Sequence, residues 1–323
     1  MAEVYNEHFN TLLSGTDGND DIRNGSYAIG LSFNGGSNVT INGGDGNDSI
    51  FNLGSRITID GGAGNDYIVS WGESAATISG SDGDDTIETD YGENISISGG
   101  LGADSITNYG FSSIIDGDAD NDSIENYGNN VTINGGAGDD AIRNWGENNV
   151  FVYSSGDGND FIEGFKSTST LQILSDTVDL AYTDSKDTFL QIGEGRVILQ
   201  GLSSLENINL MDANGEVESL AIYKAVVGTE AEDSLNGKEN FLILAQGGDD
   251  KVSNKSSNVT IDGGDGNDYI YSDRSNVSIS GGAGNDSIFN KTSYLSTKTE
   301  TVTEIVQVEE PVYETQTFQE EYY

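Results

Sequence analysis

The sequence contains no cysteine, one proline and one histidine among 323 residues. The absence of cysteine excludes disulfides, thiolate-bound zinc, iron–sulfur clusters and cysteine nucleophiles. The single histidine, His8, lies in an acidic N-terminal stretch, which argues against a histidine-based zinc site or a Ser-His-Asp triad. Because proline is nearly absent while glycine is abundant, the composition indicates regular turns and excludes collagen or a proline-rich linker.

Basic residues are also few, with 13 Lys and Arg against 55 Asp and Glu and a formal net charge of -42. This balance excludes a basic nucleic-acid-binding surface, so no nucleic-acid partner is expected. No run approaches the ~18 consecutive apolar residues of a membrane-spanning helix, so we do not expect a membrane-integral protein. The N-terminus lacks the basic and apolar regions of a secretory signal peptide, and any export is therefore expected to use another route.

A nine-residue pattern, Gly-Gly-x-Gly-x-Asp-x-Ile-x, occurs several times, for example at residues 43–51, 61–69 and 281–289, and other copies depart from it. We index each copy by its sixth-position aspartate. These aspartates are Asp20, Asp48, Asp66, Asp85, Asp104, Asp122, Asp140 and Asp160 in a first array, and Asp233, Asp250, Asp268 and Asp286 in a second. Most steps between copies are 18 or 19 residues, so the period is twice nine.

Each 18-residue period contains two short strand patterns separated by two turns, one rich in glycine and aspartate and one with an aromatic residue before glycine. Val131 and Ile133 lie two residues apart, so they share one face of their strand and should point inward. Isoleucines such as Ile124 should point inward from the opposite strand in the same way. Stacking such units at about 4.8 Å would bury a narrow aliphatic core that no single unit could bury. The repeat therefore predicts an all-β solenoid.

The glycine-aspartate turns combine exposed backbone carbonyls with a carboxylate. Glycine adopts positive φ at no steric cost, and hard cations such as calcium take six to eight oxygen ligands, often mixing carboxylates with carbonyls. In a stacked solenoid each aspartate would lie close to the next turn. A cation fits between successive turns, and without it the carboxylates repel one another.

These residues resemble the RTX (repeats-in-toxin, hemolysin-type) calcium-binding nonapeptide repeat, GGxGxDxUx, in which U is a large aliphatic residue. The resemblance implies a right-handed parallel β-roll that holds several calcium ions between adjacent turns. It also implies a bacterial protein that is secreted to the outside or the cell surface. Its partner in export would be a type I secretion exporter that reads an uncleaved C-terminal signal.

By this resemblance the calcium ligands are position-six carboxylates and turn glycines. The expected ligands are Asp48, Asp66, Asp85, Asp104, Asp122, Asp140, Asp160, Asp268 and Asp286, with Gly44, Gly46, Gly62, Gly64, Gly136, Gly138, Gly264, Gly266, Gly282 and Gly284. Weaker sites are expected where the motif departs further, at Asp20, Asp233 and Asp250.

Two departures carry specific expectations. The step from Asp20 to Asp48 is longer than one plain period, so Asp20 is expected to lack a stacked neighbour. In the copy that ends at Asp122, Asp120 replaces the fourth glycine, so that turn is expected to be strained or to bind differently.

The motif occurs once per 18 residues, so calcium is expected along one edge only. The other edge carries five aromatic residues, each followed by glycine: Trp71, Tyr91, Tyr109, Tyr127 and Trp145. One interpretation is a structural aromatic ladder, and the other is a candidate ligand face that binds carbohydrate.

The pattern divides the chain into five parts. Residues 1–13 are a lead-in, 14–164 the first β-roll, 165–227 a non-repeat β cap or spacer, 228–290 the second β-roll and 291–323 an acidic tail. The tail holds seven glutamates and no basic residue from residue 300 onward. It is either a solvated acidic segment or a candidate type I secretion signal.

The leading hypothesis is a secreted calcium-binding β-roll that folds on calcium binding and acts as a structural or interaction module. One alternative is a surface adhesin or matrix protein that binds glycans or other surface proteins through an outward ladder of Thr40, Thr58, Thr77, Ser96 and Thr132. Another is the export and folding module of a larger effector. No enzyme is expected, because catalytic motifs are absent and acid pairs such as Asp84-Asp85 point to opposite strand faces.

Overall fold

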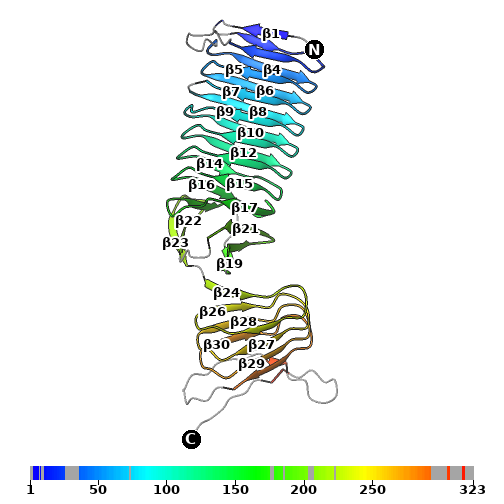
Figure 1. Ribbon diagram of the computed structural model, residues 1–323, viewed down its shortest axis with the longest axis vertical. Helices are drawn as coiled ribbons and strands as arrows, with labels where there is room; N and C mark the ends of the chain where they lie inside the picture. The colour runs from blue at the N-terminus through cyan, green and yellow to red at the C-terminus, as the bar shows by residue number, and fades with distance from the viewer. Residues whose placement is uncertain are drawn as a thin grey trace. The chain divides into compact units, whose positions relative to one another are not determined.

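The computed structural model describes residues 3–6, 8, 11–25, 36–72, 74–174, 178–184, 186–202, 207–221, 223–291, 304–305 and 315–316. All regular structure in these residues is β-strand, which confirms the predicted all-β class. Within this described part of the chain, no helix is long and apolar enough to cross a membrane. The chain packs as two units, Met1–Ala181 with Lys186–Ala221, and Tyr182–Ser185 with Ile222–Tyr323 (Figure 1).

The first unit is a solenoid of two parallel sheets, each built from alternate strands of the chain (Figure 1). The odd-strand sheet contains β1 (Glu3–Asn6), β3 (Asp21–Asn24), β5 (Ser49–Asn52), β7 (Tyr67–Ser70), β9 (Thr86–Thr89), β11 (Ser105–Asn108), β13 (Ser123–Asn126), β15 (Ala141–Asn144) and β17 (Asn159–Glu163). The even-strand sheet contains β2 (Leu12–Ser14), β4 (Thr40–Asp45), β6 (Ile57–Ala63), β8 (Ala76–Asp82), β10 (Ser96–Leu101), β12 (Ile114–Ala119), β14 (Thr132–Asn134), β16 (Val150–Tyr153) and β18 (Thr170–Ile173). One rung consists of an even strand, a glycine-aspartate turn, an odd strand and a second-edge turn. The predicted parallel β-roll is therefore confirmed.

Isoleucines from both sheets form the core between them. In the odd-strand sheet Ile50 pairs with Ile68 and Ile68 with Ile87, and all three are fully buried. The even-strand sheet repeats this with Ile41 and Ile59. Each buried isoleucine contributes about 1.5–3 kcal/mol relative to an exposed one, so the stacked register is set by this aliphatic column.

The stacked strands begin before the first nonapeptide. β1 pairs with β3 and β2 with β4, so part of the predicted lead-in belongs to the solenoid. β3 in turn pairs with β5, and the backbone N–H of Asp20 donates to Oδ1 of Asp48 at 2.7 Å. The expectation that Asp20 lacks a stacked neighbour is therefore wrong. Residues 26–35, which lie within that longer step, are outside the described residues.

Each sheet of the first unit gains an antiparallel hairpin beyond the last repeat, and the odd-strand sheet continues from β20 to β19 (Val178–Thr183). β21 (Gly195–Gln200) continues the odd-strand sheet beyond β17 and pairs antiparallel with β20 (Thr188–Ile192). β22 (Asn207–Met211) continues the even-strand sheet beyond β18 and pairs antiparallel with β23 (Val217–Ala221). The non-repeat segment thus replaces parallel stacking by local pairing where the repeat stops.

The second unit repeats the two-sheet arrangement in a shorter form. One sheet contains Tyr182–Thr183 of β19 (Val178–Thr183), β24 (Tyr223–Val227), β26 (Phe241–Leu244), β28 (Val259–Asp262) and β30 (Val277–Ser280). The other contains β25 (Ser234–Asn236), β27 (Lys251–Asn254), β29 (Tyr269–Ser272) and β31 (Ser287–Asn290). The predicted tail 291–323 lies outside the described residues except for residue 291 and an antiparallel pair, β32 (Glu304–Ile305) with β33 (Thr315–Gln316).

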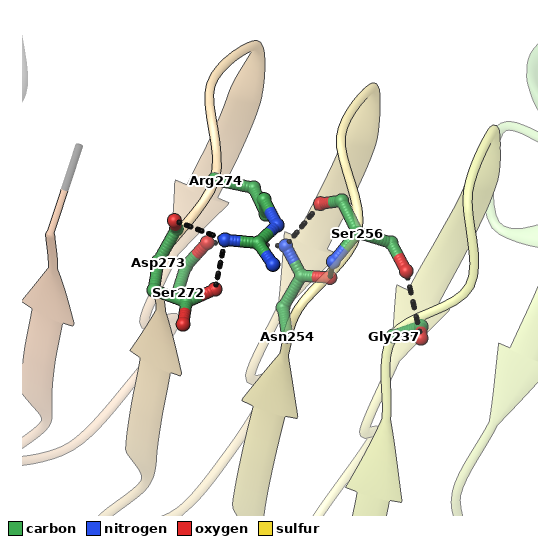
Figure 2. Close-up of polar contacts among 6 residues, drawn as sticks. All are labelled: Gly237, Asn254, Ser256, Ser272, Asp273 and Arg274. Carbon is green, nitrogen blue, oxygen red and sulfur yellow. Dashed lines mark hydrogen bonds and ion pairs between the residues drawn. The ribbon is translucent and has the colours of Figure 1, made fainter. Parts of the chain in front are cut away.

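Buried amides stack along the second edge, where each odd strand ends. Asn108 Nδ2 donates to Oδ1 of Asn126 at 2.8 Å and to the carbonyl of Gly110 at 3.0 Å. Figure 2 shows the equivalent turns of the second unit, where Asn254 Nδ2 donates to Oγ of Ser272 at 3.1 Å. The sequence reveals these asparagines as part of a turn pattern, but not that their side chains bond between rungs.

Candidate metal sites along the glycine-aspartate turns

The backbone of the glycine-aspartate turn explains the spacing of its glycines. Positions two and four adopt positive φ, as in Gly62 at 107° and Gly64 at 124°. Such values are strained for residues with a Cβ. The predicted ligands Gly44, Gly46, Gly136, Gly138, Gly264, Gly266, Gly282 and Gly284 occupy the same two positions with φ between 89° and 158°.

The turn ending at Asp122 keeps this path without glycine at positions two and four. Asp118 and Asp120 both have φ of 74°. A left-handed conformation costs a residue with a Cβ roughly 1–2 kcal/mol. The structure therefore places backbone strain in this turn, as the sequence predicts.

Position one requires glycine for a different reason, because two oxygens approach it closely. A Cβ built on Gly61 would lie 2.3 Å from Oδ2 of Asp66 and 2.7 Å from the carbonyl oxygen of Gly80 in the next rung. Gly263 repeats the arrangement in the second unit, with Oδ2 of Asp268 at 2.3 Å and the carbonyl oxygen of Gly281 at 2.4 Å. The same two kinds of oxygen approach Gly43, Gly80, Gly99 and Gly117, so these turns direct a carboxylate oxygen and a carbonyl oxygen toward the same point.

The position-six aspartates form one file in each unit, and all of them are buried except Asp233, which is half-buried. The backbone N–H of Asp48 donates to Oδ1 of Asp66, and that of Asp66 donates to Oδ1 of Asp85, both at 2.7 Å. The same bond links Asp85 to Asp104, Asp104 to Asp122, Asp122 to Asp140 and Asp140 to Asp160 in the first unit, and Asp233 to Asp250, Asp250 to Asp268 and Asp268 to Asp286 in the second. The structure therefore brings together every aspartate that the motif selects within each unit.

The second carboxylate oxygen has no such donor at most of these positions. Among the described residues, a buried Oδ2 without a hydrogen-bond partner occurs at Asp48, Asp66, Asp85, Asp104, Asp122, Asp140, Asp250 and Asp268. Leaving one buried acceptor unsatisfied costs about 1–3 kcal/mol, and more for a charged group. A repeated cost of this size indicates that each Oδ2 is built to receive a proton or a cation.

Burial makes these carboxylates hard to ionise. Desolvation, reinforced by neighbouring carboxylates and partly offset by the backbone N–H donor, raises the pKa of Asp66 to about 6, of Asp85 to about 7 and of Asp122 to about 8. The same causes raise the pKa of Asp104 and Asp140 to about 6 and of Asp160 to about 8. Positive charge supplied beside Oδ2 would reverse this shift.

The donor set fits a hard cation. The facing atoms are carboxylate and carbonyl oxygens, the ligands that calcium prefers. The described residues contain no group of three or more His, Cys, Asp or Glu side chains that could hold a metal ion together. Carbonyl oxygens of two stacked turns would therefore have to complete the shell around each Oδ2, which gives one candidate site between successive turns.

A second ladder on the outside of the turn was not predicted. Oδ1 of Asn47 accepts the backbone N–H of Asn65 at 3.1 Å, and Oδ1 of Asn65 accepts that of Asp84 at 3.2 Å. These bonds run in the opposite direction along the solenoid to those of position six. The signal was available in the sequence, because position five is asparagine or aspartate in copy after copy.

The predicted aromatic residues form a partial stack on the second edge. The rings of Tyr109 and Tyr127 are 4.6 Å apart at 10°, and those of Tyr127 and Trp145 are 4.4 Å apart at 4°. Tyr91 is tilted by 50° against Tyr109, and Trp71 is 36% exposed one rung earlier. Ring faces that cover one another are not free to stack on a sugar, so this geometry favours a structural ladder.

A known family model matches the segments that contain these turns. The family model of the RTX calcium-binding nonapeptide repeat matches residues 35–54, 58–73, 72–106, 244–276 and 262–290, in both units. No curated protein matches the chain. Among solved structures, the crystal structure of the extracellular lipase LipA from Serratia marcescens is similar at 19% identity and a TM-score of 0.29. The match covers 59% of this chain and 37% of the lipase chain.

Proposed function

Since the chain is a β-roll built from RTX calcium-binding nonapeptide repeats, we propose that it is a secreted bacterial protein whose folding is driven by several calcium ions. The observation that supports this proposal is the file of buried aspartates, in which an unpartnered Oδ2 faces a turn carbonyl. Calcium bound there would satisfy both oxygens and compensate the carboxylate charge. The ligands would be the position-six aspartates and backbone carbonyls of adjacent turns.

Calcium would act as the switch between an extended and a folded chain. A chain of formal charge -42 with stacked carboxylates repels itself when calcium is scarce, as inside a cell. Each site that binds only the folded state adds about 2.7 kcal/mol when calcium stands at 100 times its Kd. Several such sites exceed the net stability of an ordinary domain. This dependence of folding on calcium is consistent with export as an unfolded chain through a type I exporter and folding outside the cell.

The folded roll would serve as a structural or interaction module and not as an enzyme. RTX repeat proteins are typically secreted by bacteria, which supports an extracellular or cell-surface location. The sequence offers binding turns in regular succession and no recognisable catalytic motif. Whether the chain is the export and folding module of a larger effector stays a prediction.

A glycan-binding or adhesive role is a second candidate, supported by one surface. Thr40, Thr58, Thr77 and Ser96 are in direct register on neighbouring strands of the even-strand sheet, and all four are exposed. This gives a flat column of hydroxyl groups, which Ile114 interrupts in the next rung. A glycan array probed in calcium buffer tests this role, and a scaffold-only protein would bind no glycan.

Circular dichroism during a calcium titration tests the leading proposal. In excess chelator we expect a roll so weakened that much of its β signal is lost near room temperature and the rest melts at a low Tm, and on adding calcium we expect a cooperative rise of β signal. Magnesium at the same concentration is the control, because it demands a tighter octahedral geometry and should not substitute. Full β structure in chelator, unchanged by calcium, would contradict calcium-driven folding.

A further inference from the structure

The first aspartate of each file differs from the later ones in the partners of its Oδ2. In the first unit, Oδ2 of Asp20 accepts the backbone N–H of Thr16 at 2.6 Å and the hydroxyl of Thr16 at 2.9 Å. In the second unit, Oδ2 of Asp233 accepts the backbone N–H of Thr229 at 2.6 Å and its hydroxyl at 2.8 Å. At eight later positions of the two files the same oxygen is buried without a hydrogen-bond partner. Both units therefore satisfy this oxygen in the same way, and at the same end of the file.

The threonine stands at position two of its copy, where the later turns have a different backbone conformation. Position two is glycine with φ of 107° in the copies of Asp48 and Asp66, at Gly44 and Gly62. Neither threonine is among the described residues that adopt positive φ. A β-branched residue strongly disfavours positive φ, so threonine keeps the ordinary conformation. In that conformation its N–H reaches the carboxylate of its own turn.

Ser81 shows that a hydroxyl group at position two is not sufficient. It occupies position two of the copy that ends at Asp85, but its φ is 85°. Its hydroxyl donates to Oδ1 of Asp60 at 2.8 Å, and Oδ2 of Asp85 stays unpartnered. The backbone conformation that threonine imposes is thus the feature that separates the first turns from the later ones.

Apart from these donors, the first turns have the oxygen arrangement of the later ones. A Cβ built on Gly15 would lie 2.8 Å from Oδ2 of Asp20 and 2.0 Å from the carbonyl oxygen of Gly43 in the next rung. Gly228 repeats this with Oδ2 of Asp233 at 2.9 Å and a carbonyl oxygen at 2.5 Å. An ionised carboxylate oxygen accepts through two lone pairs, and the N–H and O–H groups of threonine occupy both. Their hydrogens place partial positive charge where a cation would bind, and hydrogen bonds to an ionised acceptor are strong.

We infer that the first turn of each unit excludes calcium, and that the threonine at its second position causes the exclusion. This inference rests on the proposed function, because it presupposes calcium at the later turns. The weaker sites that the resemblance implies at Asp20 and Asp233 would then be absent. Hydrogen bonds within the chain would hold these two turns in shape, and the ions would begin one turn later, beside Oδ2 of Asp48 and of Asp250.

Native mass spectrometry of the full chain in buffered calcium tests the inference, because it counts bound ions as whole numbers. Thr16→Gly gives the first turn the Gly-Gly pair of the later turns and frees Oδ2 of Asp20, so we expect one additional ion per chain. Thr229→Gly should add one ion in the second unit. Combining Thr16→Gly with Asp20→Asn should return the count to that of the wild type, since the added ion needs the carboxylate.

Asp20→Asn and Asp48→Asn in the wild-type background form the matched pair. Asparagine at position 20 keeps an oxygen that accepts both threonine hydrogens, so this variant stays informative even where Thr16→Gly weakens the first rung. Asp20→Asn should leave the count unchanged, and Asp48→Asn should lower it by at least one ion. A count that Asp20→Asn lowers, or that Thr16→Gly leaves unchanged, would overturn the inference alone. A wild type without calcium, or an unchanged count in Asp48→Asn, would overturn the proposed function and this inference with it.

Discussion

The substitution Asp66→Asn distinguishes the two roles of each aspartate in the file, as hydrogen-bond acceptor through Oδ1 and as proposed calcium ligand through Oδ2. Asp66 Oδ1 accepts the N–H of Asp48 at 2.7 Å, while Oδ2 is buried, unpartnered and faces the carbonyl oxygen of Gly80. Asparagine keeps the Oδ1 acceptor and replaces Oδ2 by an NH₂ group that can donate to that carbonyl. The substitution therefore removes an unsatisfied acceptor and a calcium ligand at the same time, and the two effects have opposite signs.

The magnitudes follow from these contacts. In chelator, relief of one unsatisfied buried acceptor is worth about 1–3 kcal/mol, which for a unit of this size raises Tm by roughly 2–12 °C. In calcium at 100 times Kd, loss of one ion removes about 2.7 kcal/mol of stabilisation. The increase in Tm that calcium produces should then shrink by roughly 5–11 °C for each ion lost.

Thermal unfolding by circular dichroism, in chelator and in calcium, measures both effects. Asp84→Asn is the matched control, because it removes the same charge from the neighbouring position but from an exposed side chain outside the buried file. We expect the control to change Tm little in either buffer. A lower Tm of Asp66→Asn in chelator, together with an unchanged calcium-induced rise, would refute the assignment of Oδ2 as an orphaned ligand.

Three further outcomes are expected. The raised pKa values of Asp66 and Asp122 mean that the calcium-free fold binds more protons than the unfolded chain, so its Tm in chelator should fall as pH rises from about 4 to 8. A calcium-free Tm that rises with pH would contradict this prediction. In calcium, acidification over the same range should release the ions. Gly61→Ala would push a Cβ against Asp66 Oδ2 and the carbonyl of Gly80, costing about 1–3 kcal/mol in urea unfolding, whereas Gly18→Ala meets open space and should be near neutral. Ala103→Asn supplies the acceptor missing from the position-five ladder and should stabilise the first unit by about 0.5–1 kcal/mol, and no gain in calorimetric Tm would argue against that ladder.

The fold was predictable because its dominant determinant is periodic. An 18-residue repeat with isoleucine at a fixed position can bury all of these side chains by stacking its rungs with the isoleucines inside. The positions of Ile50, Ile68 and Ile87 in one buried column follow from spacing alone. The same spacing places the aspartates in file.

What the sequence did not reveal depends on contacts between rungs. Spacing fixes which residues stack, but not whether Asp48 Oδ1 bonds toward the preceding rung while Asn47 Oδ1 bonds toward the following one. The neighbour of Asp20 was missed because the step to Asp48 is ten residues longer than one period, whereas β3 still pairs with β5. Loop insertions cost little in closure entropy, so step length alone is a poor guide to stacking.

The most direct test of the central claim is the number of calcium ions bound per chain, measured by equilibrium dialysis against buffered calcium. The wild type should retain several ions, because buried aspartates with an unpartnered Oδ2 recur in both units. A triple variant, Asp66→Asn with Asp85→Asn and Asp104→Asn, should lose the ions shared between those rungs and keep those of the second unit. A wild type that retains no calcium, or a triple variant with an unchanged count, would contradict calcium binding along this edge.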